Sequence, residues 1–386
     1  MLQFTDLGIG NGLLNRIAEA SGHDDRESVR ILVSNGMVLV GIIAIIAISI
    51  FIFINKYISW PAVFNAKSPI AISEVGKTTF VLVVIFTLNI ALSVIIRVNM
   101  ALQQGYINGI YNIFGNILGL LALIVAIKLK SSLPVIIALY MLGPVIGTFV
   151  NGLYLFLYKC PWLKPSLNCL DLSIARDLLS LGVWFLLLQI VVSFNNAIPN
   201  LVISHVLGLE YVAVFAVALK LASIAVIIQT TILIPLWPAY AEARTRGDWT
   251  WLERTLKRSL TLCGSVGLVT SIIIVVFGSS IIRIWIGADS VPPRGVLWGL
   301  GAWVFSSSLH VPLAVFLNGM GRVRIQALYG IIFSVFMLFL CIFLTRYFNL
   351  VGSAWAYGTA YTFPSLIVSS VIVIQILIGK SKRNSL

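Results

Sequence analysis

The sequence has little charge. Only 10% of its 386 residues are charged, 59% are hydrophobic, and the mean hydropathy is +1.03. A typical soluble domain has about 45–50% apolar and about 25% charged residues, so this chain lacks the charge that a water-facing surface requires. The composition excludes an ordinary soluble protein and predicts an all-α integral membrane protein. It also argues against a large catalytic domain outside the membrane.

Motifs for redox, metal and nucleotide chemistry are missing as well. The four cysteines, Cys160, Cys169, Cys263 and Cys341, have no CxxC or zinc-like spacing, so we expect neither a structural disulfide nor a metal site. The sequence contains no Walker motif, and no set of nucleophile, base and oxyanion donors stands out. We therefore expect a protein that is not an enzyme and that has no cofactor.

Long apolar runs alternate with short polar connections along the chain. A membrane-spanning helix needs about 20 apolar residues, whereas the strands of a membrane barrel alternate over about ten residues. These runs are long and continuously apolar, so we expect helices. Ten full spans are predicted, at 31–54, 78–103, 107–127, 133–157, 181–206, 211–239, 260–283, 294–318, 325–345 and 350–378.

The positive charges indicate how these spans are oriented. One set of connections holds sixteen of the 26 Lys and Arg residues and the opposite set holds eight, so we expect the first set to be cytoplasmic. The remaining two, Arg97 and Lys220, fall inside spans. In a soluble protein the formal charge of +13 would suggest nucleic acid. Here the basic stretch 244–258, with Trp249 and Trp251, is better explained as an amphipathic segment attracted to anionic lipid.

An internal repeat divides the chain. The segment AEASGHDDRESVRILVSNGMVLV from Ala18 recurs as AEARTRGDWTWLERTLKRSLTLCGSVGLV from Ala241, and RVNMALQQGYING from Arg97 parallels HVPLAVFLNGMGRVR from His310. The repeat predicts two homologous helical bundles. We expect an N-terminal lobe at 1–157, a cytoplasmic linker at 158–180, a six-helix C-terminal lobe at 181–378 and a basic cytoplasmic tail at 379–386.

Four segments resemble a known family of transporters: DLGIGNGLLNRIAEASGHDD, VLGLEYVAVFAVALKLASI, LNGMGRVRIQ and NLVGSAWAYGTAY. They are similar to the polysaccharide transporter (Wzx-type) flippases of the multidrug/oligosaccharidyl-lipid/polysaccharide exporter superfamily. The resemblance implies a twelve-helix fold with two six-helix lobes around a central cavity. Against that pattern we expect this chain to lack the first helix and part of the second, leaving ten full spans and a partial N-terminal helix.

Polar residues recur at helical spacing within several spans. The stripes suggest either hydrogen bonds between helices, worth about 0.6 kcal/mol each on average, or the wall of a hydrated cavity that binds sugar hydroxyls. For the set as a whole we favour the cavity. The candidate glycan-binding residues are Asn89, Asn112, Gln189, Asn196 and Asn200.

Arg97 and Lys220 are the most informative of the polar residues. A cation at the centre of a bilayer costs at least about 2.5–3.5 kcal/mol on insertion scales, so such residues usually have a function. Either side chain could instead extend to the headgroups. The functional interpretation is that they bind the diphosphate of a lipid-linked substrate, because no acidic residue lies deep within the later spans. On that view the substrate supplies their missing counter-charge.

Two further residues are candidates for ion coupling. His310 occupies the repeat position of Arg97, and it is either a neutral hydrogen-bonded histidine or a proton-sensitive group that faces the cavity and the substrate. Asp6, in the family-like DLG sequence, is either a coupling site or a helix cap.

The resemblance implies a flippase that moves undecaprenyl-diphosphate-linked oligosaccharide units across the bacterial inner membrane for O-antigen, lipopolysaccharide or exopolysaccharide synthesis. The expected partners are this glycan lipid, the membrane lipids, and a polysaccharide polymerase or export machinery; nucleic acid is not expected. Two alternatives stay open. An ion-coupled multidrug exporter would need embedded carboxylates, and a polysaccharide polymerase or ligase would need a sizeable outer loop.

Overall fold

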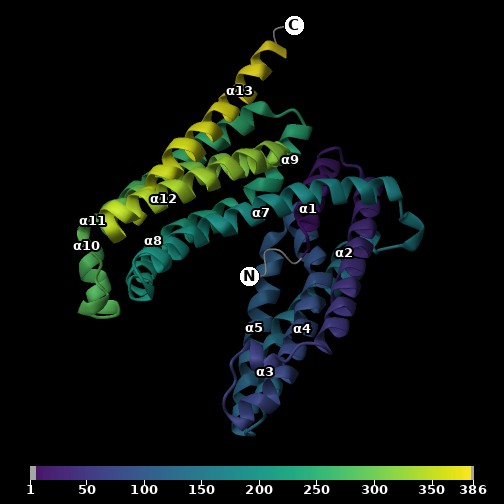
Figure 1. The fold of residues 1–386 in the computed structure, drawn as a ribbon. Coiled ribbons are helices and arrows are strands. Elements are labelled where there is room, and N and C mark those ends of the chain that lie inside the picture. Colours follow the sequence, from purple (N-terminus) through teal and green to yellow (C-terminus); the bar gives the residue numbers. More distant parts are fainter. Residues whose placement is uncertain (1–5, 384–386) are drawn as a thin grey trace. The chain divides into compact units, whose positions relative to one another are not determined.

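The computed structural model describes residues 6–383, and every regular element among them is helical (Figure 1). The chain forms two compact units, Met1–Leu186 and Leu187–Leu386. Helix α7 (Leu172–Val206) begins in the first unit and ends in the second.

Unit 1 is built from long apolar helices joined by short turns. Its helices α1, α2 and α4 pack against one another, and α6 packs against both α4 and α5. A connection of short helical turns, Leu155–Lys159, Pro161–Leu163 and Leu167–Cys169, leads to α7. The helices that precede it are α1 (Ile9–Gly22), α2 (Arg26–Asn55), α3 (Trp60–Val63), α4 (Pro69–Ala101), α5 (Gly105–Lys128) and α6 (Leu133–Tyr154).

Unit 2 is arranged around α11 (Arg294–Gly319), which contacts most of its other helices. Two-thirds of the most apolar window of α11 is buried, a larger share than in any other candidate span of the described residues. The surrounding helices are α8 (Leu209–Leu233), α9 (Leu236–Thr245), α10 (Trp249–Trp285), α12 (Val323–Ala360), the π-helical turn Tyr361–Leu366 and α13 (Ile367–Arg383).

Nine stretches of the described residues are long and apolar enough to cross a membrane, against the ten predicted. The difference arises in the last stretch, Val323–Gly379, which is 57 residues long. The backbone leaves helical geometry at Phe348 and Asn349, where Asn349 has a φ of 50°. Beyond this break the Gly352 backbone lies against that of Leu344, and the hydroxyls of Thr345 and Ser353 lie 2.6 Å apart. Residues eight positions apart in a straight helix would be about 12 Å apart, so the chain reverses at this point, where the sequence predicts the boundary between 325–345 and 350–378.

The turns at the start of the internal repeat have the same local design. Asp25 caps α2 by accepting a hydrogen bond from the Ser28 amide at 3.0 Å, and Asp248 caps α10 by accepting one from the Trp251 amide at 3.0 Å. The residue before each cap, Asp24 or Gly247, has a positive φ. A carboxylate that accepts an amide hydrogen bond at a helix N-terminus is a favourable cap. At Asp25 these hydrogen bonds from Ser28 lower the pKa of the carboxyl group.

Helices α5 and α6 make backbone-to-backbone contact. Gly115 and Gly119 of α5 face Gly143 and Gly147 of α6, and a Cβ atom added at Gly115 would lie 2.6 Å from the Gly143 carbonyl oxygen. Small residues at four-residue spacing permit this close approach. The two GxxxG sequences therefore serve a contact within the chain.

This contact predicts a sharp difference between two glycines of the same helix. Gly115→Ala forces the α5 and α6 backbones apart and should destabilise the protein by about 1–3 kcal/mol, the usual cost of overpacking. Gly109 has open space around its Cα, so Gly109→Ala should be neutral or slightly stabilising. The measurement is the thermal unfolding midpoint of the purified protein in detergent, and equal midpoints for the two variants would contradict the packing described.

Candidate functional site

A buried ion pair joins the start of α1 to the end of α4. The Oδ2 atom of Asp6 lies 3.8 Å from Nε of Arg97, the Asp6 side chain is 3% exposed and the Arg97 side chain is 25% exposed. The other carboxylate oxygen of Asp6 accepts a hydrogen bond from the Gly8 amide at 3.0 Å. Asp6 is thus both a turn residue and the counter-charge of Arg97.

Two glycines allow the two charges to meet. A Cβ atom at Gly10 would collide with Oδ2 of Asp6 and would lie 3.0 Å from Cγ of Arg97. Gly8 has a φ of 76°, and a Cβ atom there would collide with the Gly182 carbonyl oxygen of α7. The structure therefore requires glycine at these two positions, because a larger side chain would collide with neighbouring atoms. The two glycines bring the first turn of α1 against α7 and leave room for the ion pair.

The ion pair corrects one expectation from the sequence. Arg97 has a protein counter-charge, Asp6, so the substrate is not needed to supply it. The expectation failed because it considered acidic residues only within the later spans.

Arg97 nevertheless has unused hydrogen-bonding capacity. A guanidinium carries five N–H donors, and charge-assisted bonds to a carboxylate are typically about 2.7–2.9 Å long. The 3.8 Å approach of Asp6 is longer than that. Among the described residues Arg97 makes no hydrogen bond, so its donors are free to bind an anion.

Lys220 lies in unit 2 on the exposed face of α8. The buried face of this helix includes Ala218 and Ala222, and Lys220 is two residues from each, which is about half a helical turn. Within the part of the chain that the structure describes, no acidic side chain pairs with Lys220. It is therefore a lone cation on an apolar helix, as the sequence suggested.

The candidate residues of α4 and α5 form local hydrogen bonds. The Asn89 amide nitrogen donates to the Ile85 carbonyl oxygen of its own helix at 3.1 Å. Asn112 is exposed, and its side-chain oxygen accepts from Asn116 at 2.6 Å. Asn89 and Asn112 are not brought together with Arg97 by any described contact.

Other asparagines connect the helices of unit 1. Asn99 of α4 donates to Asn108 of α5 at 2.9 Å and to Asn151 of α6 at 3.0 Å, and Asn151 donates to Asn108 at 2.9 Å. Asn99 and Asn151 are buried. Asn108 therefore forms hydrogen bonds between helices, the first of the two interpretations offered for polar residues within spans. Asn151 lies alone on its helix, so no spacing pattern indicated it.

The α7 candidates in unit 2 have different surroundings. Asn196 is exposed and accepts a hydrogen bond from the Tyr357 hydroxyl at 3.0 Å. Gln189 and Asn200 each have a buried side-chain oxygen without a hydrogen-bond partner among the described residues. Buried acceptors are normally satisfied, so these two positions could accept hydrogen bonds from a ligand.

His310 lies in a hydrogen-bonded network of α11, α12, the π-helical turn and α13. Ser365 lies 3.2 Å from its ring nitrogens, and Ser369 lies 3.3 Å from Nδ1 and 3.0 Å from the Tyr329 hydroxyl. The imidazole also meets the Tyr361 ring edge-on, with centroids 6.2 Å apart. These contacts agree with the interpretation of His310 as a hydrogen-bonded histidine.

An aromatic cluster that the sequence analysis missed links His310 to Asn196. Tyr361 contacts Tyr357 at 5.4 Å between ring centroids, and Trp303 stacks on Tyr357 at 4.9 Å. The signal was present as a tyrosine pair at four-residue spacing, which shares one helix face. Unit 2 therefore combines aromatic faces, hydroxyls and one imidazole, whereas unit 1 holds the charged pair.

Solved structures of membrane transporters share this fold. A MATE protein crystallised in its bent conformation is 16% identical, with a TM-score of 0.85 and coverage of 99% of this chain and 86% of that chain. An outward-facing multidrug resistance MATE family transporter of the MOP superfamily is 15% identical, with a TM-score of 0.83 and the same coverage. A MOP superfamily transporter from Pyrococcus furiosus, described as having a binding pocket of reverse polarity that suggests a different function, is 14% identical, with a TM-score of 0.80 and coverage of 96% and 84%.

The fold is therefore the one found in these solved MATE and MOP superfamily transporters. The model of the polysaccharide biosynthesis protein family matches residues 1–243, which is more than half of the chain. The chain belongs to this Wzx-like family of polysaccharide biosynthesis proteins. A search of curated protein sequences gave no match.

The ion pair predicts that the two single substitutions, Arg97→Gln and Asp6→Asn, destabilise the protein by different amounts and that their effects are not additive. Arg97→Gln leaves the buried Asp6 carboxylate unpaired and should cost about 3 kcal/mol, within the range for breaking a buried pair. Asp6→Asn should cost less, because the Arg97 side chain is partly exposed and can reorient. The double variant should recover most of the loss, as read from thermal unfolding midpoints in detergent.

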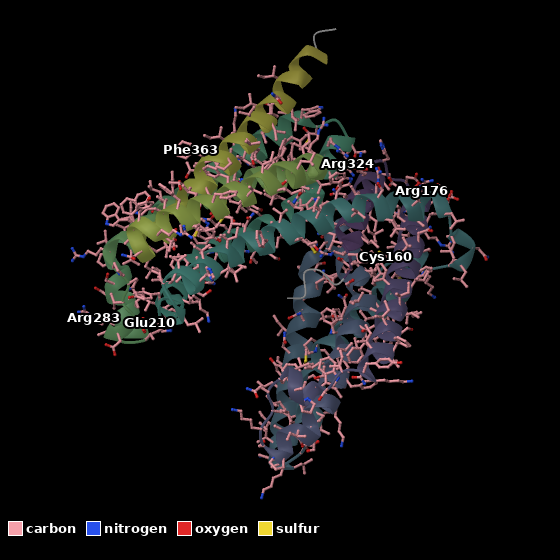
Figure 2. The ribbon with its side chains drawn as sticks, in the orientation of Figure 1. Cys160, Arg176, Glu210, Arg283, Arg324 and Phe363 are labelled. Atoms are coloured by element: carbon pink, nitrogen blue, oxygen red, sulfur yellow. The ribbon has the colours of Figure 1, made fainter. Side chains whose placement is uncertain are left out.

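Arg176→Gln is the matched control, because Arg176 is an exposed arginine of the same unit (Figure 2). Its unfolding midpoint should equal that of the unaltered protein. Additive losses in the Asp6→Asn/Arg97→Gln variant would show that the two side chains do not interact.

Proposed function

We propose that the protein is a flippase that moves an undecaprenyl-diphosphate-linked oligosaccharide from the cytoplasmic to the periplasmic leaflet of the bacterial inner membrane by alternating access. Family membership supports a role in polysaccharide biosynthesis, and the fold supports transport. The observation that carries the proposal is the underused guanidinium of Arg97. It sits in an apolar bundle, faces one distant carboxylate and has donors left for an anion.

The diphosphate suits this site for a geometric reason. A planar guanidinium binds two phosphate oxygens through parallel N–H donors, and such bidentate bonds are stronger and more directional than the bond of a point charge. Lys220 is a separate candidate for phosphate binding in unit 2. In unit 2, the side-chain oxygens of Gln189 and Asn200 accept hydrogen bonds from glycan hydroxyls, and Asn196 is a further candidate for binding the glycan. Asn89 and Asn112 are the candidates in unit 1, and the polyprenyl chain remains in the bilayer.

The ion pair also suggests how transport is coupled. When the diphosphate occupies Arg97, Asp6 loses the one charged partner that it has among the described residues. Release of the substrate restores the ion pair. His310, in its network of serines and tyrosine, is the second coupling candidate.

The alternatives are less well supported. A multidrug exporter for cations needs an embedded negative charge, and Asp6 is such a residue, but Arg97 neutralises it. A polymerase or ligase needs a long outer loop with catalytic residues. The connections on the predicted outer side are short, such as residues 286–293 between α10 and α11.

Export measured in a deletion strain tests the proposal. Loss of the gene should abolish surface polysaccharide and should cause lipid-linked repeat units to accumulate facing the cytoplasm. Arg97→Ala should lower export at least about tenfold, because an ion pair to phosphate is worth more than 1.4 kcal/mol when desolvated. Arg97→Lys should retain part of the export, and Lys220→Ala should reduce it.

The double variant Asp6→Asn/Arg97→Gln, called the compensated variant because it leaves no unpaired charge, distinguishes a transport defect from a folding defect. Asp6→Asn/Arg97→Gln should reach the membrane at the normal level and still fail to export, while Arg176→Ala should export normally. Normal surface polysaccharide in the deletion strain would refute the flippase assignment. Normal export by the compensated variant would refute the role of Arg97 alone.

A further inference from the structure

A groove runs along the outside of unit 2 between α10 and α13, with α11 at its floor. Its volume is about 500 Å³, within the range of about 300–1,000 Å³ that is typical of ligand sites. Its lining is mainly aliphatic and consists of Glu253, Leu256, Lys257 and Leu260 of α10, Leu313 of α11, and Ser370, Val373, Ile374, Leu377 and Ile378 of α13. The groove lies over a buried apolar cluster to which Leu256, Leu313 and Val373 belong.

Cations border this groove on one side. A second hollow of about 460 Å³ on α10 is lined by Lys257, Arg258, Thr261, Leu262 and Ser265, so Lys257 belongs to both hollows. Lys257 and Arg258 are exposed. They lie eight and nine positions after Trp249, the first residue of α10, and so about 12–14 Å along the helix.

Together, the two hollows indicate which kind of ligand would bind here. The aliphatic groove favours a hydrocarbon chain, and the neighbouring Lys257 and Arg258 favour an anionic group at the end of that chain. Basic pockets between membrane helices bind anionic lipid headgroups on the same grounds. Glu253 adds one negative charge to the lining, but it interacts with another residue of the chain. The hydroxyls of Thr261 and Ser265 line the cationic hollow and can bond a phosphate.

We propose that this groove binds an anionic membrane phospholipid, with its phosphate on Lys257 and Arg258 and one acyl chain between α10 and α13. The site belongs to unit 2 alone and is separate from Asp6 and Arg97. Several lining side chains, such as Ile374 and Leu262, are exposed, so a lipid of the surrounding bilayer has direct access. The proposal does not depend on what the protein transports.

Native mass spectrometry of the full chain in detergent tests the headgroup contact. The protein is incubated with phosphatidylglycerol or with phosphatidylcholine, and the retained lipid is counted. Lys257→Gln/Arg258→Gln should lower phosphatidylglycerol affinity about fivefold per cation removed, and phosphatidylcholine binding should not change. Arg283→Gln is the matched control, because Arg283 is exposed near the far end of α10 (Figure 2).

The acyl-chain contact is tested by filling the groove. Ile374 is 53% exposed and lines the groove, whereas Ile272 of α10 is 52% exposed and does not. Ile374→Trp should reduce retention of phosphatidylglycerol, and Ile272→Trp should not.

Three results would overturn the proposal. The first is unchanged phosphatidylglycerol binding in the Lys257→Gln/Arg258→Gln variant. The second is an equal loss in the Arg283→Gln control, which would indicate general electrostatics. The third is displacement of phosphatidylglycerol by an equal or lower concentration of a polyprenyl phosphate, which would assign the groove to a carrier lipid.

Discussion

Arg97 can lie within a bundle of apolar helices because Asp6 comes to 3.8 Å from it. A charge without a partner in such surroundings is costly, and much of the structure of unit 1 follows from meeting that requirement. The turn that precedes α1 must place Asp6 beside α4, Gly10 must leave space for both side chains, and Gly8 must let the turn approach α7. The same pair leaves most donors of Arg97 unfilled. A residue stabilised in this way is stable at rest and still able to exchange its partner for another anion.

The two repeats have similar turns between their helices but differ in the polar residues that lie within those helices. The Asp-capped turns before α2 and α10 match in both cap geometry and the sign of φ. A second pair of turns, after α4 and α11, has Gln103 and Gly321 at positive φ. On the helices that precede these turns, however, one repeat carries Arg97 in α4 and the other carries His310 in α11. The first has an ion pair and the second has neutral hydrogen bonds, so the shared scaffold presents different chemistry from each half.

The sequence predicted those features that depend on local pattern. Apolar runs located the spans, and the fold agrees with the all-helical expectation. The break near Asn349, where the chain reverses, was predicted as the boundary between two spans. The four-residue spacing of the glycines in α5 and α6 is a local pattern of the same kind, and it corresponds to the close contact between these helices.

Partnerships between distant residues were not predictable in the same way. A stripe on a helix shows which residues share a face, but it does not show what that face contacts. Asn108 and Asn112 are one turn apart on α5, yet the first bonds Asn99 and Asn151 while the second is exposed. Asp6 was recognised as unusual, but its pairing with Arg97 depends on how α1 enters the bundle, which no spacing encodes.

The glycine contact between α5 and α6 has a mechanical consequence. At these four glycines the main chains touch, so no side chain there can change rotamer and let one helix slide past the other. We expect the two helices to move together when unit 1 changes shape. We expect the chain to bend instead where the helical geometry is irregular, such as the π-helical turn at Leu155–Lys159 that follows α6.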